Sequence, residues 1–291
     1  GFEGDQDLIY GGDIASWIKL ANSLKIKLAA NIADVNPTKA ATMIAEAEAG
    51  AFESNDDNAT IAYLGSSPNT NPIWLDLVQS GRADYVIANT IVDKLLDLSD
   101  PRLAVYADET EDGDFIGGEY GTANTYSANS HVGALYHEPD LEGVILDYAE
   151  VQFLLAEAAA RGFATSETVE TYYENGIRAS MEYWGVDDAE IDAYLAQPSV
   201  AYATAAGDWK QKIGTQEWIA LYNRGFEGWT VWRRLDFEGF NVPDGLEESD
   251  IPRRLIFPIE EATLNPSSWK QAIDMIGGSD DVQTTVFWDV N

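Results

Sequence analysis

The chain has 291 residues, 45% of them hydrophobic and 11% aromatic, which is enough for one large core or two small ones and excludes global disorder. Its formal net charge of −33, from 50 acidic residues against 17 basic ones, excludes nucleic acid as a partner, because phosphate binding needs a basic patch, and leaves neutral ligands or cations. There is no cysteine, which excludes disulfides and Cys-ligated metal centres, and no run of about 18 apolar residues that could span a membrane.

The first fifth of the chain predicts a helical hairpin. Apolar side chains recur with helical spacing over residues 14–32, and Asp13 stands where an N-cap residue is expected. Pro37 then begins an Ala-rich helix that ends at Gly50, the usual placing of proline and glycine in a helix. The turn between the two helices is short, so we expect them to be antiparallel.

Two long segments that follow are polar and rich in turn residues. The first covers residues 51–82, and the second covers residues 107–140 and carries five glycines and three tyrosines. A helix is predicted between them, over residues 84–98, and Pro101 stops it. Long loops in compact domains are usually functional or mobile, so we expect ligand contacts to come from these two segments.

A second hairpin is predicted over residues 146–184, with Gly162 ending its first helix. Both hairpins take about 38 residues, close to the 34 of a tetratricopeptide repeat. The last part of the chain, from Phe237, is turn-rich with short elements, and no linker separates two domains. The sequence therefore predicts a mostly α fold, in which residues 1–291 form one domain: a tetratricopeptide-like helical-hairpin scaffold with long inserted loops.

Aromatic residues recur at helical spacing in the segment from Gln216 to Arg234. This pattern predicts one helix with one aromatic face, and such a face is more often core than ligand platform. The scarce basic residues of the same segment predict ion pairs that fix the helix in place. The aromatic residues are Trp218, Tyr222, Phe226, Trp229 and Trp232, and the basic ones are Arg224, Arg233 and Arg234.

Several short motifs occur in a fixed order along nearly the whole chain. They are DLIYGGD leading into WIKLANSL, then DPRL, YAEV with LAEA, the aromatic segment, IPRRL, NP and the final TTVFWDV. This ordered set resembles the SusD/RagB family, the glycan-binding outer-membrane lipoproteins of Bacteroidetes. Family members are typically longer, and their lipidated cysteine and first helical repeats have no counterpart in this sequence.

The resemblance implies a noncatalytic protein, exposed at the cell outer membrane, that binds an oligosaccharide and delivers it to a TonB-dependent, SusC-like transporter. Its membrane anchor would lie outside this chain, and it would require no cofactor. One alternative is a structural lid or docking subunit of the transporter that binds peptide or no glycan. The other is a glycoside hydrolase, which needs a pair of catalytic carboxyl groups. Among fifty acidic residues many such pairs are possible, so the sequence does not single one out.

A glycan site needs an aromatic ring for the apolar face of the sugar and polar side chains for its hydroxyls. Trp74, in the segment NTNPIW at the edge of the first loop, is the first candidate for such a ring. The alternative for each ring is that it packs its loop onto the helices. The further candidates are Tyr63, Arg82, Tyr120, Tyr126 and Tyr136, with Asn124, Asn129 and His131 beside them in the sequence.

One acidic stretch has the spacing of a calcium-binding loop. Asp108, Thr110, Asp112 and Glu119 fall at positions one, three, five and twelve, and Gly113 falls at position six. Thr110 departs from the usual Asp or Asn, and a solvated acidic loop is the alternative. Ca²⁺ is therefore the one metal that the sequence suggests.

Overall fold

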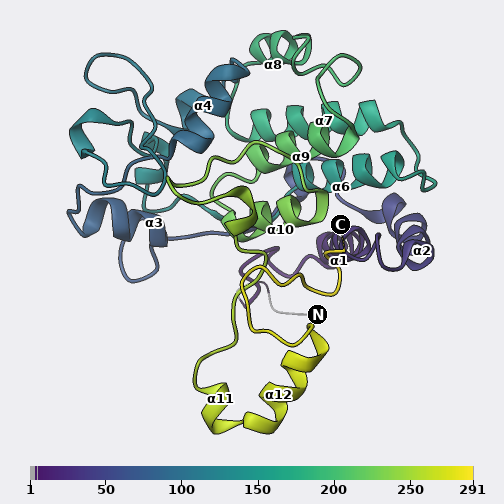
Figure 1. The fold of residues 1–291 in the computed structure, drawn as a ribbon. Coiled ribbons are helices and arrows are strands. Elements are labelled where there is room, and N and C mark those ends of the chain that lie inside the picture. The colour runs from purple at the N-terminus through teal and green to yellow at the C-terminus, as the bar shows by residue number, and fades with distance from the viewer. Residues whose placement is uncertain (1–3, 5, 291) are drawn as a thin grey trace.

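The computed structural model describes residue 4 and residues 6–290, and helices make up most of its regular structure (Figure 1). In these residues the only sheet is a two-stranded antiparallel one, formed by β1 (Ala59–Ile61) and β2 (Gly143–Leu146). The mostly helical fold predicted from the sequence is confirmed. None of the helices in this described part is both long enough and apolar enough to cross a membrane.

The predicted first hairpin consists of α1 (Ile14–Asn31) and α2 (Pro37–Ala47), at the right of Figure 1. Asp13 caps α1 by accepting hydrogen bonds from the next backbone N–H groups. Asn36 caps α2 in the same way, and Pro37 takes the first helical position, where a missing N–H costs little. These local signals explain why the sequence locates both helix starts.

The second hairpin consists of α6 (Tyr148–Ala160) and α7 (Val169–Tyr183), and it lies among the central helices of the molecule (Figure 1). Residues 149–158 of α6 are all buried, so this helix has no solvent-facing side. A β-carbon at Gly176 of α7 would lie 2.9 Å from the Phe153 ring, so glycine allows the two helices to approach closely. Gly162, at a φ of +80°, follows the end of α6 as predicted.

The prediction of one helix over the aromatic segment is wrong. The structure has two helices there, α9 (Trp209–Ala220) and α10 (Gly225–Leu235), joined by a turn at residues 221–224. Asn223 in this turn has a φ of +69°, a left-handed conformation that asparagine tolerates better than most residues. The five rings therefore share no single face: Trp232 is buried, whereas Phe226 is 73% exposed.

The predicted helix over residues 84–98 starts later than expected, because α4 covers only Asn89–Asp97. Ile87, just before it, donates its N–H to the Ser130 carbonyl and accepts from the Gly118 N–H, both in the second long loop, so this stretch is extended rather than helical. The remaining helices are α3 (Pro72–Trp74), continued by a π-helical turn (Leu75–Gln79), α5 (Leu103–Tyr106), α8 (Asp188–Leu195), α11 (Glu261–Leu264) and α12 (Pro266–Met275). Single 3₁₀ turns lie at Glu48–Gly50, Asn55–Asp57, Tyr126–Ala128, Ala134–His137 and Glu248–Asp250.

The C-terminal α11 and α12 lie apart from the main helical body, at the bottom of Figure 1. They belong to the segment that begins at Phe237, which has the short elements and turns that the sequence predicts. Arg253 connects this segment to the body by pairing with Asp236, the residue after α10, and with Asp289 near the C-terminus.

A fully buried ion pair connects α5 to the second hairpin. The Arg102 guanidinium binds the Asp100 carboxylate with two hydrogen bonds, of 2.9 and 2.6 Å, and both side chains are 0% exposed. Its remaining N–H groups donate to Ser180 of α7 and Gln216 of α9. The buried charges are therefore paired and hydrogen-bonded, which is the condition for tolerating them in a core.

A second buried network surrounds α6. Glu150 pairs with Lys27 of α1 and with Arg224 of the turn before α10, at 2.9 and 2.7 Å. Glu157, about two turns further along α6, pairs with Arg234 of α10 at 2.9 Å. The predicted ion pairs of Arg224 and Arg234 are thus present, and they fix α1, α10 and the turn around one helix.

Arg233 does not follow this pattern. Within the described residues it has no ion pair with a carboxylate, so the predicted ion pair is wrong for this residue. Its guanidinium instead lies 3.8 Å from the centre of the Trp229 ring and 4.8 Å from that of Trp288. A planar guanidinium stacks well on indole faces, and this stacking takes the place of the ion pair.

We predict that Arg102→Ala lowers the free energy of unfolding by about 3–5 kcal/mol, because it leaves the Asp100 carboxylate buried without its partner. The matched control is Arg178→Ala, which removes a pair to Asp192 whose side chains are 35% and 68% exposed. That change is expected to cost less than about 1 kcal/mol. Urea unfolding measures both values, and equal losses would contradict the buried pair's role.

A second prediction concerns pH. Burial raises the pKa of Glu217, the carboxyl beside Arg234, from 4.5 to about 8, against the attraction of that arginine. The folded protein then keeps a proton that the unfolded chain releases between these two values. This contribution to stability is full below pH 4.5 and is lost as the pH rises towards 8.

Glu217→Gln should therefore flatten the fall in unfolding free energy between pH 4.5 and 8. Glu46→Gln, at an exposed pair with Lys25, serves as the control and should leave the slope unchanged. Denaturant unfolding at a series of pH values tests this, and parallel profiles for all three proteins would refute it.

Candidate functional site

Two neighbouring hollows lie where the long loops meet the second hairpin. The first has a volume of about 210 Å³ and the second about 330 Å³, and Ile73, Tyr222 and Asn223 line both. The walls come from the segment around α3, from β2, from the end of α7 and from the turn between α9 and α10. We call the two hollows together the loop groove.

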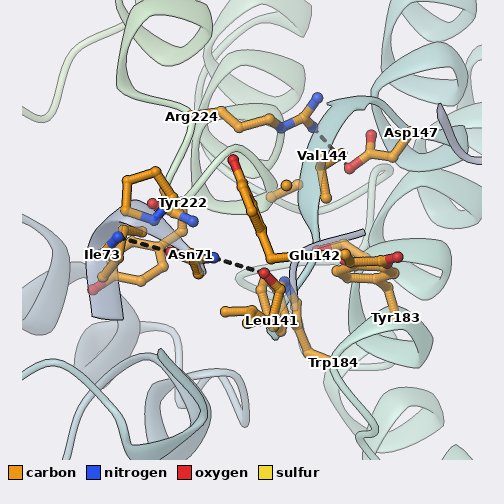
Figure 2. Close-up of a pocket in the computed structure, with 16 residues that line it drawn as sticks. Asn71, Ile73, Leu141, Glu142, Val144, Asp147, Tyr183, Trp184, Tyr222 and Arg224 are labelled. Atoms are coloured by element: carbon orange, nitrogen blue, oxygen red, sulfur yellow. Dashed lines mark hydrogen bonds and ion pairs between the residues drawn. The ribbon is translucent and has the colours of Figure 1, made fainter. Parts of the chain in front are cut away.

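Polar side chains in the first hollow are held by defined partners (Figure 2). The Tyr183 hydroxyl donates to the Glu142 carboxylate at 2.8 Å, and Arg224 binds Asp147 at 2.7 Å. Burial, and then the bond to Glu142, raise the pKa of Tyr183, whose hydroxyl is in any case protonated at neutral pH. Burial also raises the pKa of Asp147, and Arg224 opposes that shift.

Asn71 fixes the loop wall of the first hollow. Its side-chain amide donates to the Leu141 carbonyl at 2.7 Å, and its side-chain oxygen accepts from the Ile73 N–H at 2.7 Å (Figure 2). Its own backbone N–H donates to Pro139 at 2.7 Å. Asn71 thereby caps α3 and ties it to the end of the second long loop, with Pro72 in the first helical position.

A set of packed rings stands behind the groove. Tyr222 stacks on Tyr106 with ring centres 4.2 Å apart, and Trp184 meets Tyr106 edge-on at 5.7 Å. Tyr63 in the first hollow and Tyr85 in the second stack on no other ring in the described part of the chain. These two rings are therefore the groove's candidate aromatic faces, although the Arg82 guanidinium lies over one face of Tyr85, 4.7 Å from the ring centre.

The structure brings three of the predicted site residues to the groove or its edge. Tyr63 lines the first hollow, and Tyr136 lines the second but is 1% exposed, so its ring is part of the core. Arg82 lines neither hollow, but its guanidinium lies 4.7 Å from the centre of the Tyr85 ring while it binds Asp84. Arg82 thus supports an aromatic residue of the groove from outside.

The other three predicted rings lie elsewhere. Trp74 follows Ile73 in α3 and is half-buried, but it lines neither hollow. Tyr126 stacks on His131 with ring centres 3.7 Å apart. Tyr120 is 54% exposed and lines a different hollow. Ligand contact by these residues stays a prediction.

Sequence reasoning missed several groove residues. The sequence identifies Tyr222 only as one of the aromatic residues at helical spacing. It does not point to Asn223, because a single asparagine does not reveal the left-handed conformation that it adopts. Tyr85 stands within the stretch predicted as helix, where an exposed ring has no special meaning. Tyr183 and Trp184 stand at the end of a helix. Only the hydrogen bond from Tyr183 to Glu142, seen in the structure, shows that Tyr183 faces the groove.

The predicted calcium loop has the turn that its spacing suggests, since Gly113 has a φ of +84°. Asp108 accepts a hydrogen bond from the backbone of Ala134 at 3.1 Å, and the Thr110 N–H donates to Asp114 at 2.8 Å. In the part of the chain that the structure describes, no three or more His, Cys, Asp or Glu side chains are grouped to hold a metal ion. Calcium binding by Asp108, Thr110, Asp112 and Glu119 stays a prediction.

We predict that Asn71→Ala loosens the groove wall, because it removes a donor from Leu141 and an acceptor from the Ile73 N–H. The expected loss of stability is about 1–3 kcal/mol, with faster hydrogen exchange at Ile73. Asn36→Ala, the cap of α2, lines neither hollow and should cost about 1 kcal/mol without that local change. Unchanged exchange at Ile73 in Asn71→Ala would show that the wall does not depend on this side chain.

Comparison with known proteins supports the resemblance seen in the motifs. The model of a SusD-like family, described as "Starch-binding associating with outer membrane", matches residues 2–258. A solved chitin-binding protein is 30% identical, with a TM-score of 0.83 over 98% of this chain and 67% of its own. A chitin-binding SusD homolog from Flavobacterium johnsoniae is 28% identical, with a TM-score of 0.84 over 99% of this chain and 66% of its own.

A SusD homolog from Bacteroides uniformis is also 28% identical, with a TM-score of 0.85 over 100% of this chain and 68% of its own. The chain thus spans about two thirds of the length of these solved relatives. No curated protein matches it. The family model covers most of the sequence, and the fold agrees with the solved homologues over almost all of it. The chain therefore belongs to the SusD-like family.

Proposed function

We propose that this protein is a noncatalytic, outer-membrane-associated subunit that binds a neutral oligosaccharide in the loop groove and passes it to a TonB-dependent, SusC-like transporter. The observation that carries the proposal is the groove itself, with the unstacked rings of Tyr63 and Tyr85 in two adjoining hollows. The names of two solved relatives, which call them chitin-binding, support a glycan as the ligand class.

The chemistry of the groove suits a neutral sugar. An aromatic face takes the C–H side of a pyranose ring, and Tyr63 and Tyr85 each offer one. Glu142 accepts a hydrogen bond from Tyr183 through one carboxylate oxygen, which leaves acceptor capacity for sugar hydroxyls. With a net charge of −33, an anionic sugar would be repelled.

Affinity in such a groove is expected to be modest. Each hydroxyl that binds the protein gives up a hydrogen bond to water, so the net gain per bond is about 1 kcal/mol. The fixed partners of Glu142, Asn71 and Arg224 reduce the cost, since these side chains are ordered before the ligand arrives. A modest affinity also suits a protein that must release its ligand to a transporter.

The noncatalytic assignment rests on the same contacts. Asp147 is engaged by Arg224, and Glu142 by the Tyr183 hydroxyl. A glycosidase instead needs two carboxyl groups facing one bond, one of them protonated as an acid and the other ionised. Asp147 and Glu142 are therefore both held by protein partners, which argues against their acting as such a pair, and Asp76 is the further carboxyl that lines the second hollow.

We predict that Tyr63→Ala and Tyr85→Ala each weaken oligosaccharide binding about tenfold, the loss of roughly 1.4 kcal/mol of ring contact. Calorimetric titration with neutral malto- and chito-oligosaccharides measures this. Phe226→Ala is the matched control, because Phe226 is aromatic and 73% exposed but lines no part of the groove. Trp74→Ala tests whether the ring next to Ile73 extends the site.

The alternatives give different results in the same experiment. If every oligosaccharide fails to bind while the protein still captures a transporter barrel, the structural lid is the better description. Release of reducing sugar during the titration would identify a hydrolase. A parallel titration with Ca²⁺ on the wild type and Asp108→Ala tests the calcium loop.

A further inference from the structure

A separate hollow of about 560 Å³ lies beside α10. It is formed by the residues before and after the start of α4, by the second long loop, by α9 and α10, and by the segment that follows them. None of its lining residues lines the loop groove. We call it the aromatic hollow, because its walls include Tyr120, Trp218, Trp229, Trp232 and Phe240.

The rings of this hollow are held in place by their neighbours. Phe240 meets Trp218 edge-on, with ring centres 5.1 Å apart, and Trp232 edge-on at 5.9 Å. The Trp229 indole N–H donates to the Pro252 carbonyl at 2.7 Å. The aromatic walls are therefore ordered by the protein itself, so that a ligand would not have to arrange them.

The loop that carries Tyr120 is also fixed against the hollow. The Tyr120 N–H donates to Asn89 at 3.2 Å. Gly121 has a φ of +86°, and a β-carbon there would lie 2.6 Å from the Pro243 side chain. Glycine therefore permits this contact between the second long loop and the segment after α10. A tyrosine that is 54% exposed is thereby held at one side of the hollow.

Two carboxylates, those of Glu247 and Asp250, line the hollow together with these rings. Each accepts the other's backbone N–H in a capping box, and Asp250 also accepts from the Gln283 amide at 3.1 Å. All of these donors are uncharged. In the part of the chain that the structure describes, neither carboxylate forms an ion pair with a basic side chain. The hollow therefore carries two negative charges that the protein does not pair.

The two arginines that stack on the tryptophan walls leave this balance unchanged. Arg233 and Arg253 lie 3.8 and 5.4 Å from the centres of their indole rings, but neither lines the hollow. Arg253 pairs with Asp236 and Asp289, and the charge of Asp289 also acts on Arg233. Outside the hollow, two arginines thus lie beside two aspartates. Their stacking also shows that these indole rings accept a cation on a face.

Aromatic walls with unpaired carboxylates suit a cation. Ring faces attract positive charge, tryptophan most strongly, and the net charge of −33 adds to this attraction. The other polar side chains of the wall, Thr90 and Asn241, are hydrogen-bonded to each other. A primary ammonium group would bring three N–H donors, and the ring surface offers them no acceptor. A quaternary ammonium group has no N–H and presents methyl groups to the rings.

We propose that the aromatic hollow binds small quaternary ammonium compounds of the choline type through their trimethylammonium group. The methyl groups lie against the rings, and Glu247 and Asp250 balance the charge. A compound that adds an anionic group to the same head binds more weakly, because these carboxylates repel it. This inference goes beyond the proposed function and does not rest on it, since the ligand is no saccharide and the hollow is not the loop groove.

Choline and its neutral analogue, in which a tert-butyl group replaces the trimethylammonium group, provide the first test. They have the same shape and differ in charge. Each is titrated calorimetrically into the wild type, with sodium chloride of equal ionic strength as the blank for choline. We expect choline to bind about tenfold more tightly than the analogue, and more tightly than glycine betaine or phosphocholine. Equal binding of choline and the analogue, or no heat from choline beyond the blank, overturns the site.

The second test removes the charges of the hollow. The double variant Glu247→Gln, Asp250→Asn keeps an acceptor oxygen at each position of the capping box, so it should fold normally. Choline affinity is expected to fall about tenfold. The matched control is Asp244→Asn, Glu248→Gln, which removes two exposed carboxylates of the same segment that do not line the hollow. Equal losses in the two double variants would show attraction by the surface charge alone and overturn the site.

The third test concerns the rings. Tyr120→Phe keeps an aromatic face and should bind choline like the wild type, whereas Tyr120→Leu keeps an apolar side chain and should bind about threefold more weakly. Tyr85→Ala changes the loop groove only, so it should leave choline affinity unchanged. If Tyr85→Ala weakens choline binding and Tyr120→Leu does not, the cation binds in the loop groove and the inference is wrong. Failure of choline to bind leaves the oligosaccharide titrations of the loop groove unaffected, so the two proposals are tested separately.

Discussion

The fold depends on the need to pair the charges of one buried helix. α6 is enclosed on every side over residues 149–158, yet it carries Glu150 and Glu157 inside that stretch. A buried carboxylate without a partner costs several kcal/mol, so cations from other elements must reach it. Glu150 forms ion pairs with Lys27 of α1 and with Arg224 before α10, and Glu157 forms one with Arg234 of α10. The positions of elements far apart in the sequence are thus set by two glutamates.

This pairing also explains how the interior positions the surface sites. Arg224 belongs to the turn between α9 and α10, and its two ion pairs hold that turn against α6. Tyr222 and Asn223, the residues just before it, line both hollows of the loop groove. The helices on either side of the turn supply Trp218 and Trp229 to the aromatic hollow. One anchored turn therefore orients side chains that line separate hollows.

The sequence predicts what local chemistry decides. Asp13, Pro37 and Gly162 mark helix ends by caps and backbone preference, and both hairpins could be drawn from them. It does not predict the break at residues 221–224, because the aromatic period continues through the turn and the deciding contacts come from α6, some seventy residues earlier. The site is harder for the same reason. Tyr63 could be named as a ring in a polar loop, whereas Tyr85 gains its role only from where Arg82 and the neighbouring hollow place it.

The use of arginine in the interior has a consequence for the outside of the molecule. Of the 17 basic residues, several, among them Arg102 and Arg234, form ion pairs with buried carboxylates, while most of the 50 acidic residues face water. The excess of negative over positive charge is therefore even greater at the surface than in the whole chain, and the surface carboxylates repel one another. Added salt at about 0.1 M largely screens interactions between exposed charges that lie more than about 10 Å apart, but it weakens buried pairs far less. Moderate ionic strength should thus reduce the repulsion between surface carboxylates while leaving the buried ion pairs nearly unchanged. Although the fold depends on ion pairs, salt should therefore increase its stability.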